Sequence, residues 1–181
     1  MKYKRTEKEL GKFSELAIEK AQLELGTTRT IRGRKVRRVA KGTLGKSLFS
    51  TIKTRDGRIT MQFRSKVDYA DFVHEGVNGT RVKVGSKYSF KKKNINTQWV
   101  ETWMRDKRIR LTKLVPGKGR VFVKDTEANR KAAAFVIGRS IAQRGIVGVP
   151  FMKLGVEAAL KKFDNRLLDA IELDLNEELG L

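Results

Sequence analysis

The spacing of apolar side chains predicts helices near both ends of the chain. Within residues 6–25, apolar positions recur every three or four residues, the spacing of one buried helix face: Leu10, Phe13, Ala17 and Ala21. Thr6 and Glu9 have the spacing of a capping box at the start of this helix, and Gly26 is suited to end it in a left-handed conformation. We therefore expect a first helix over 6–25 with one buried stripe.

The clearest helix is predicted after the loop "GIVGVP". Its apolar positions form one continuous stripe: Val156, Leu160, Phe163, Leu167, Ala170 and Ile171. Its C-terminal part is acidic and contains Asp164, Asp169, Glu172, Asp174, Glu177 and Glu178. A further, alanine-rich helix is predicted just before the loop, from a cap at Thr126 to a stop at Gly145.

Strand patterns and a short helix are predicted between these helices. The stretch "SLFSTIKTRDGRITMQFRS" contains two β-rich runs joined by Asp56 and Gly57, a dipeptide that favours the tight turn of a hairpin. Asp68 is then expected to cap a short helix that ends at Gly76. Three side chains of this helix are expected to pack inward: Tyr69, Phe72 and Val73.

Two basic segments interrupt this pattern. Residues 27–41, within "TTRTIRGRKVRRVAKG", have few apolar side chains and form either an edge strand or a basic arm; we favour an arm that becomes ordered on assembly. Residues 81–124 form a basic insertion, with a short helix around "TQWVETWM" and a hairpin turn in "VPGKGRVF". The length of 181 residues and the hydrophobic content of 39% fit a single domain over 1–181 with this arm and insertion.

The charge of the chain points to an anionic partner. Lys and Arg number 41 against 20 Asp and Glu, a formal net charge of +21, which suits nucleic acid or an acidic protein surface. The basic runs are solvated faces, contacts to phosphates that read no sequence, or contacts to acidic proteins. The candidate contact residues are Arg32, Arg34, Lys35, Arg37, Arg38, Lys91, Lys92 and Lys93.

Several classes of site are excluded by composition. The chain has no cysteine, which rules out disulfides, thiolate zinc sites and cysteine nucleophiles. No apolar run approaches the ~20 residues that span a bilayer. The first residues, "MKYKRTEKELGKF", lack the apolar stretch of a secretory signal, so we expect a protein that stays in the cytoplasm in which it is made.

His74 is the only histidine, and it lies in "DYADFVHEGVNGT" beside Glu75. One histidine cannot form a multi-histidine metal site, and no second histidine follows in the spacing of zinc proteases. Asp71 lies one turn before His74, but no serine occurs in the strand-turn-helix context that a serine nucleophile needs. We therefore interpret the segment as a structural turn and expect no enzyme activity, no metal and no cofactor.

Three stretches, taken in order, resemble the tail-completion or head-tail joining proteins of tailed bacteriophages, also described as neck or minor tail proteins. "GTLGKSL" resembles the family's "TGxLxxSI" element, "YADFVHEGVNGT" its "YAxxVExGT" turn, and "VPFMKLGVEAAL" the late "PFxxPAxxxx" element that opens the last helix. Gly155 stands near the position where the family tends to have Pro-Ala. The resemblance covers roughly residues 1–80 and 125–175.

The resemblance implies an α+β subunit: a small, mostly antiparallel sheet flanked by N-terminal, central and C-terminal helices. It implies a virion protein, assembled in the host cytoplasm, that forms a ring homo-oligomer between portal and tail around the DNA channel. Its partners would be the portal, adjacent neck or tail proteins and, without sequence specificity, the genomic DNA. The expected subunit-interface residues are Tyr69, Phe72, Val73, His74, Glu75, Gly76, Pro150, Phe151 and Met152, with Phe72 or Phe151 as an apolar anchor.

The distribution of charge along the sequence is also compatible with contact between copies. The separation of a basic body from an acidic last helix would allow copies to meet head to tail, with unlike faces in contact.

The main alternative from another class is a basic nucleic-acid-binding accessory protein, such as a ribosome-associated or DNA-packaging factor. The charge favours it, whereas the absence of a recognisable DNA- or RNA-reading motif speaks against it.

Overall fold

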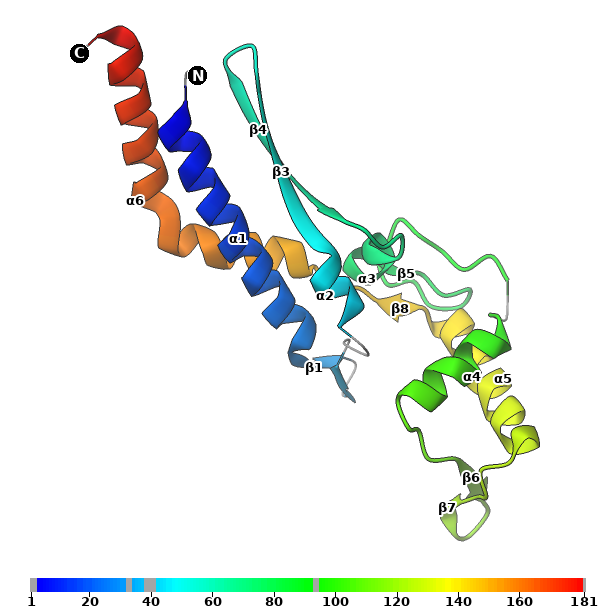
Figure 1. The fold of residues 1–181 in the computed structure, drawn as a ribbon. Coiled ribbons are helices and arrows are strands. Elements are labelled where there is room, and N and C mark those ends of the chain that lie inside the picture. The colour runs from blue at the N-terminus through cyan, green and yellow to red at the C-terminus, as the bar shows by residue number, and fades with distance from the viewer. Residues whose placement is uncertain (1–2, 32–33, 38–41, 93–94, 181) are drawn as a thin grey trace. The chain divides into compact units, whose positions relative to one another are not determined.

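The computed structural model describes residues 3–31, 34–37, 42–92 and 95–180. By their internal contacts the residues divide into two compact units, one formed by 1–74 with 149–181 and the other by 75–148. The first unit thus uses both ends of the chain and the second its middle (Figure 1). The expectation of a single domain over 1–181 remains a prediction.

The first unit is built on two long helices, α1 (Lys4–Gly26) and α6 (Phe151–Leu179), which lie side by side (Figure 1). Their shared core contains Phe13 and Ala17 from α1 with Ala159 and Phe163 from α6. The rings of Phe13 and Phe163 meet edge to face, 5.8 Å apart at their centroids. Both helices are therefore amphipathic, and each covers the apolar stripe of the other.

Gly155 allows the two helices to approach closely. A Cβ at this position would lie 2.5 Å from the carbonyl oxygen of Ala17 and 2.8 Å from the backbone nitrogen of Ala21. Real Cβ atoms do not come this near to backbone atoms, so any larger residue would push the helices apart. Packing thus explains a glycine at this position of the last helix.

The predicted hairpin is confirmed and packs on α1. Strands β3 (Leu48–Arg55) and β4 (Arg58–Ser65) pair antiparallel, with Leu48 opposite Ser65 and Arg55 opposite Arg58. Asp56 and Gly57 both have positive φ, at 51° and 72°, which is the tight turn that this dipeptide favours. The short helix α2 (Thr43–Ser47) precedes β3 and adds a buried leucine to a second core cluster: Ala21, Leu25, Leu44, Val149 and Phe151.

The second unit centres on helices α4 (Thr97–Asp106) and α5 (Glu127–Arg144). Their core consists of Val100, Met104, Leu111 and Ala134. The hairpin of β6 (Thr112–Val115) and β7 (Gly119–Phe122) lies between them in sequence, and β5 (Gly76–Val77) pairs antiparallel with β8 (Ile146–Val147). The predictions of a short helix around 97–104 and of a hairpin turn in "VPGKGRVF" are confirmed.

Helix α5 begins and ends as predicted. The side chain of Thr126 accepts a hydrogen bond from the backbone N–H of Asn129, and Gly145 ends the helix with a φ of 74°. The segment 27–41 contains β1 (Thr28–Ile31) and β2 (Arg34–Arg37), which pair antiparallel with Thr28 opposite Arg37. Residues 28–31 and 34–37 are thus paired strands, and the expectation of an arm that becomes ordered on assembly stays a prediction; residues 32–33 and 38–41 lie outside the described part.

Several local predictions at the helix ends are wrong. Helix α1 begins at Lys4, and Thr6 is a buried residue inside its first turn rather than its cap. Gly26 is the last helical residue and does not have positive φ; the chain leaves the helix at Thr27 in an extended conformation. The short helix α3 (Ala70–Glu75) begins two residues after Asp68, although it does end at Gly76, whose φ is 81°.

Some predicted core positions are exposed. Of the three side chains expected to pack inward, Tyr69 and Phe72 are exposed, and Val73 packs against the core. In α6, Leu160 and Ile171 are exposed, while Gly155, Ala159 and Asp174 are buried instead. The α+β class is confirmed, and within the described residues the strands form four separate two-stranded antiparallel sheets.

Candidate assembly surface and arginine-lined pocket

His74 is a packing residue of the first unit. Its ring lies edge-on to the ring of Phe151, with the centroids 5.1 Å apart. Phe151 is 2% exposed, and the backbone N–H of Val149 donates to the carbonyl oxygen of Val73 next to it. Within the described part of the chain, no group of three or more acidic or histidine side chains is arranged to hold a metal ion.

The glycines after His74 belong to a close backbone crossing in the second unit. A Cβ at Gly76 would lie 2.4 Å from the carbonyl oxygen of Ile146, and one at Gly79 would lie 2.2 Å from that of Gln143. Gly145 is equally restricted, because its Cβ would lie 2.4 Å from the carbonyl oxygen of Val77. Glycine is therefore required at these three positions, because any side chain there would overlap the backbone that crosses it.

Asn78, between these glycines, organises the loop that follows. Its side-chain oxygen accepts from the backbone N–H groups of Val84, at 2.8 Å, and Ser86, at 3.3 Å. Its amide group donates to the carbonyl oxygen of Ser86 and to the hydroxyl of Ser89. The hydroxyl of Ser86 donates in turn to the carbonyl oxygen of Gly76 at 2.7 Å. The sequence analysis did not identify Asn78 as a buried residue that organises hydrogen bonds; the Asn78-Gly79 pair, which is typical of turns, was the available signal.

The predicted interface residues differ in their accessibility. Tyr69 and Phe72 are exposed at 45% and 44%, and Pro150 is also exposed. Phe151 lies inside the core, which leaves Phe72 as the accessible one of the two proposed aromatic anchors. Glu75 is exposed, and its carboxylate lies 4.0 Å from the ammonium group of Lys87 as an ion pair. The remaining predicted interface residues are partly or fully buried: Val73, His74, Gly76 and Met152. Glu75 and Gly76 belong to the second unit and the others to the first.

The predicted basic contact residues are only partly described. Lys91 and Lys92 are exposed. Arg34, Lys35 and Arg37 lie in β2, and their side chains are outside the described part. Arg32, Arg38 and Lys93 lie outside the described residues altogether.

The second half of α6 carries an apolar row that faces away from the core. Leu168, Ile171, Leu175 and Leu179, which we call the outer row, follow one another at spacings of three or four residues and so share one helix face. Leu168 is 65% exposed and Leu179 is 70% exposed. The buried residues from the middle of the helix onwards, Phe163, Ala170 and Asp174, occupy a different face. Sequence reasoning assigned Ile171 to the buried stripe and left the three leucines out.

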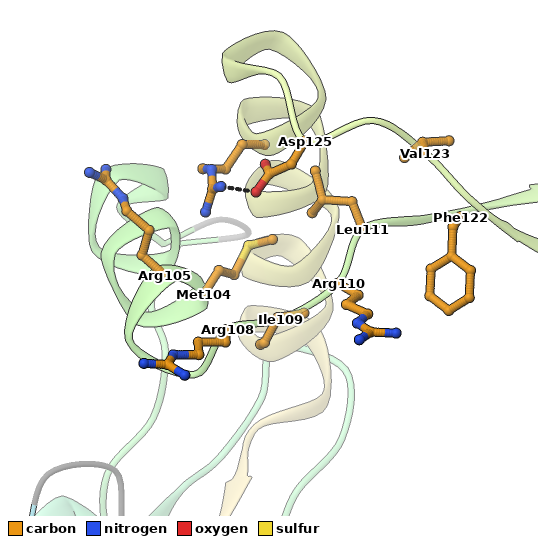
Figure 2. A pocket seen from close by; sticks show the side chains of 10 residues that line it. Met104, Arg105, Arg108, Ile109, Arg110, Leu111, Phe122, Val123 and Asp125 are labelled. Carbon is orange, nitrogen blue, oxygen red and sulfur yellow. Dashed lines mark hydrogen bonds and ion pairs between the residues drawn. The ribbon is translucent and has the colours of Figure 1, made fainter.

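An arginine-lined cavity of about 490 Å³ lies in the second unit. Its floor is apolar, since Met104 and Leu111 are buried there, and its rim carries four arginines and one carboxylate. The carboxylate of Asp125 is paired with Arg130, as the dashed line in Figure 2 shows. Within the described residues no ion pair involves the other three arginines: Arg105, Arg108 and Arg110. We call this cavity the arginine pocket.

The described helices and the known proteins add two negative findings. None of the helices in the described part of the chain combines the length and the apolarity needed to cross a lipid bilayer. No protein-family model, curated protein or solved structure matches the chain.

Proposed function

We propose that this chain is a structural subunit of the neck of a tailed-bacteriophage virion, where copies form a ring that joins the portal to the tail around the DNA channel. The observation that carries the proposal is the outer row on α6. Helical apolar rows of this spacing normally pack against another helix, and the core of this chain leaves the outer row uncovered. A second copy of the chain is the proposed occupant.

The charge distribution supports contact between copies. Exposed carboxylates, Asp169 and Glu172, lie beside the outer row, while the chain as a whole carries a net charge of +21. An acidic apolar helix on one copy therefore complements a basic surface on the next, and contact between unlike faces closes into a ring when the rotation between copies is suitable. The motifs "GTLGKSL", "YADFVHEGVNGT" and "VPFMKLGVEAAL" support the phage neck as the place of that ring.

The test is to image assembled particles and to disturb the outer row. Leu168→Glu places a charge within the row, whereas Leu23→Glu places one on a comparably exposed leucine of α1. We expect the Leu168 variant to be lost from the neck and the Leu23 variant to be incorporated. Density showing one copy of this chain, or copies on the capsid exterior away from the portal axis, would refute the proposal.

The alternative, a basic nucleic-acid-binding accessory protein, is favoured by the excess of cations. It predicts a chain that is absent from the purified particle and bound to nucleic acid in the cell. Portal, capsid and tail genes beside its own gene would favour the neck, and translation or repair genes would favour the accessory protein.

A further inference from the structure

The charge excess of this chain cannot be neutralised by copies of itself. Each copy brings the same 41 cationic and 20 anionic side chains, so a ring of any size keeps a net charge of +21 per subunit. The acidic end of α6 is also partly used within its own chain, since Asp174 is buried against Thr6 and Glu177 pairs with Arg5. The remaining cations are therefore neutralised from outside the ring, by dissolved counter-ions or by an anionic partner.

The arginine pocket gathers several of these cations around a cavity. Arg105, Arg108 and Arg110 are exposed at its rim, and the single carboxylate of the lining is already held by Arg130. Guanidinium groups present paired N–H donors that match the oxygens of phosphate groups. The lining contains arginines and no lysine.

The arrangement of the arginines favours a chain of phosphates over a single free ion. Figure 2 shows Arg105 and Arg108 toward one side of the pocket and Arg110 toward the other, so their guanidinium groups do not converge on one point. A phosphodiester backbone places its charges at regular intervals and can meet such separated groups in turn.

Phe122 adds a feature that an acidic protein partner would not require. Its ring is 70% exposed at the rim, and the guanidinium of Arg110 lies 5.9 Å from the ring centroid. An exposed aromatic ring beside cationic groups is the combination on which unpaired bases stack in single-stranded nucleic acid sites. We propose that the arginine pocket binds the phosphodiester backbone of nucleic acid, with the Phe122 ring open to an unpaired base. This inference does not depend on ring formation.

The test uses purified full-length protein and fluorescently labelled 20-nucleotide single-stranded and double-stranded DNA. The pocket variant is Arg105→Gln/Arg108→Gln/Arg110→Gln, and the charge-matched control is Lys53→Gln/Arg55→Gln/Arg58→Gln in the exposed β3–β4 hairpin. Both remove three positive charges from +21. We expect the pocket variant to lose at least tenfold in affinity and the control to lose less than threefold, at the same salt concentration.

Three outcomes would overturn the proposal. Equal losses in both triple variants would show that general electrostatics, and not the pocket, holds the DNA. Polyglutamate of 20 residues that competes as well as DNA, with the same dependence on the three arginines, would assign the pocket to an acidic protein. Inorganic phosphate that displaces DNA at millimolar concentration would reduce the site to a single-ion site.

Phe122→Ala provides a test that leaves the charge unchanged. Because base stacking on an aromatic ring contributes about five- to a hundredfold in affinity per base, we expect a loss of that order for single-stranded DNA and no change for the duplex. An unchanged affinity for the single strand would overturn the role of the ring. Arg108 has a positive φ of 50°, so a substitution there is the one that could disturb the backbone. If the triple pocket variant does not fold, Arg105→Gln/Arg110→Gln keeps Arg108 and is expected to lose at least fivefold.

Discussion

Asp174, near the end of α6, accepts hydrogen bonds from the backbone N–H and from the hydroxyl of Thr6 in α1, both at 2.8 Å. The backbone N–H of Arg5 donates to the same carboxylate at 3.3 Å. These N–H groups belong to the first turn of α1, where they have no partner within the helix, and Tyr3 before the helix supplies no side-chain cap. Asp174 therefore caps α1 from 168 residues away in sequence.

Replacing Asp174 should destabilise the first unit. Asp174→Ala removes the cap and leaves two buried or half-buried N–H groups without an acceptor, so we expect the free energy of unfolding to fall by about 1–3 kcal/mol. Urea unfolding followed by circular dichroism measures the change. Glu172→Ala, at an exposed position of the same helix, is the control and should change the free energy by less than ~0.5 kcal/mol. Equal effects in the two variants would contradict the capping role.

The same carboxylate predicts a pH dependence. Burial alone would raise the pKa of Asp174, but the hydrogen bonds from Thr6 and Arg5 and the charge of Arg5 outweigh it and lower the pKa below its ordinary value. The unfolded state therefore binds the proton more tightly, so the stabilisation is present above the unfolded pKa of about 3.9 and is lost as the pH falls through the lower folded pKa. The stability difference between wild type and Asp174→Asn should be constant from about pH 7 to 5 and shrink below about pH 4. A difference that widens on acidification would exclude this mechanism.

Gly155 and Gly11 form a matched pair for testing the helix contact. A Cβ at Gly155 meets the backbone of α1, so Gly155→Ala should destabilise by about 1–3 kcal/mol. A Cβ at Gly11 meets nothing within 4 Å, and Gly11→Ala should stabilise by about 0.5–1 kcal/mol, because glycine is a poor helix former. Thermal melting of both variants shows the opposite signs. Stabilisation by both variants would mean that the helices do not approach as closely as described.

Asn78 should control the order of the loop over 79–90. Asn78→Ala leaves the backbone N–H of Val84 and of Ser86 without their side-chain acceptor, and we expect a loss of about 2–3 kcal/mol together with faster amide exchange at these two residues. Asn78→Asp keeps the side-chain acceptor and loses the donors to Ser86 and Ser89, so it separates the effect of the accepted hydrogen bonds from that of the donated ones. Unchanged exchange in the alanine variant would show that the loop is held by other contacts.

His74→Ala should affect packing and no chemistry. The variant loses the edge contact with Phe151, which we expect to contribute about 0.5–1.5 kcal/mol, and particles that carry it should remain infectious or be mildly impaired. Infectivity and melting temperature are measured together. A hydrolytic or metal-dependent activity present in wild type and lost in this variant would sink the structural interpretation.

Local signals predicted those elements whose ends are decided locally. Thr126 caps α5 and Gly145 ends it because both act on their own backbone, and Asp56-Gly57 forms a turn through its own φ angles. The capping box at Thr6 and Glu9 failed because a carboxylate from the other end of the chain takes that role. No window of neighbouring residues contains that information.

The candidate sites were predictable only in kind. The excess of positive charge indicated an anionic partner, but the basic runs do not reveal that Arg105, Arg108 and Arg110 surround one cavity, because the second unit must fold to bring them there. The stripe in α6 was predicted from a 3.6-residue period, yet two apolar rows share this helix, and only the packing of α1 determines which one is buried. Phe72 shows the same limit: its position in the helical pattern predicted a side chain that packs inward, whereas this side chain is 44% exposed.

The division of the chain also sets an order of folding during synthesis. Residues 75–148 leave the ribosome complete, with both core helices present, before α6 has been made. Helix α1 and the β4 residues that pack on its core, Met61 and Phe63, are made before this middle part, but Ala159, Phe163 and the carboxylate that caps the first turn of α1 follow only with α6. During synthesis the apolar stripe of α1 is therefore covered in part by β4 and stays open on the side of α6 until α6 has been made, which leaves apolar surface exposed for that interval.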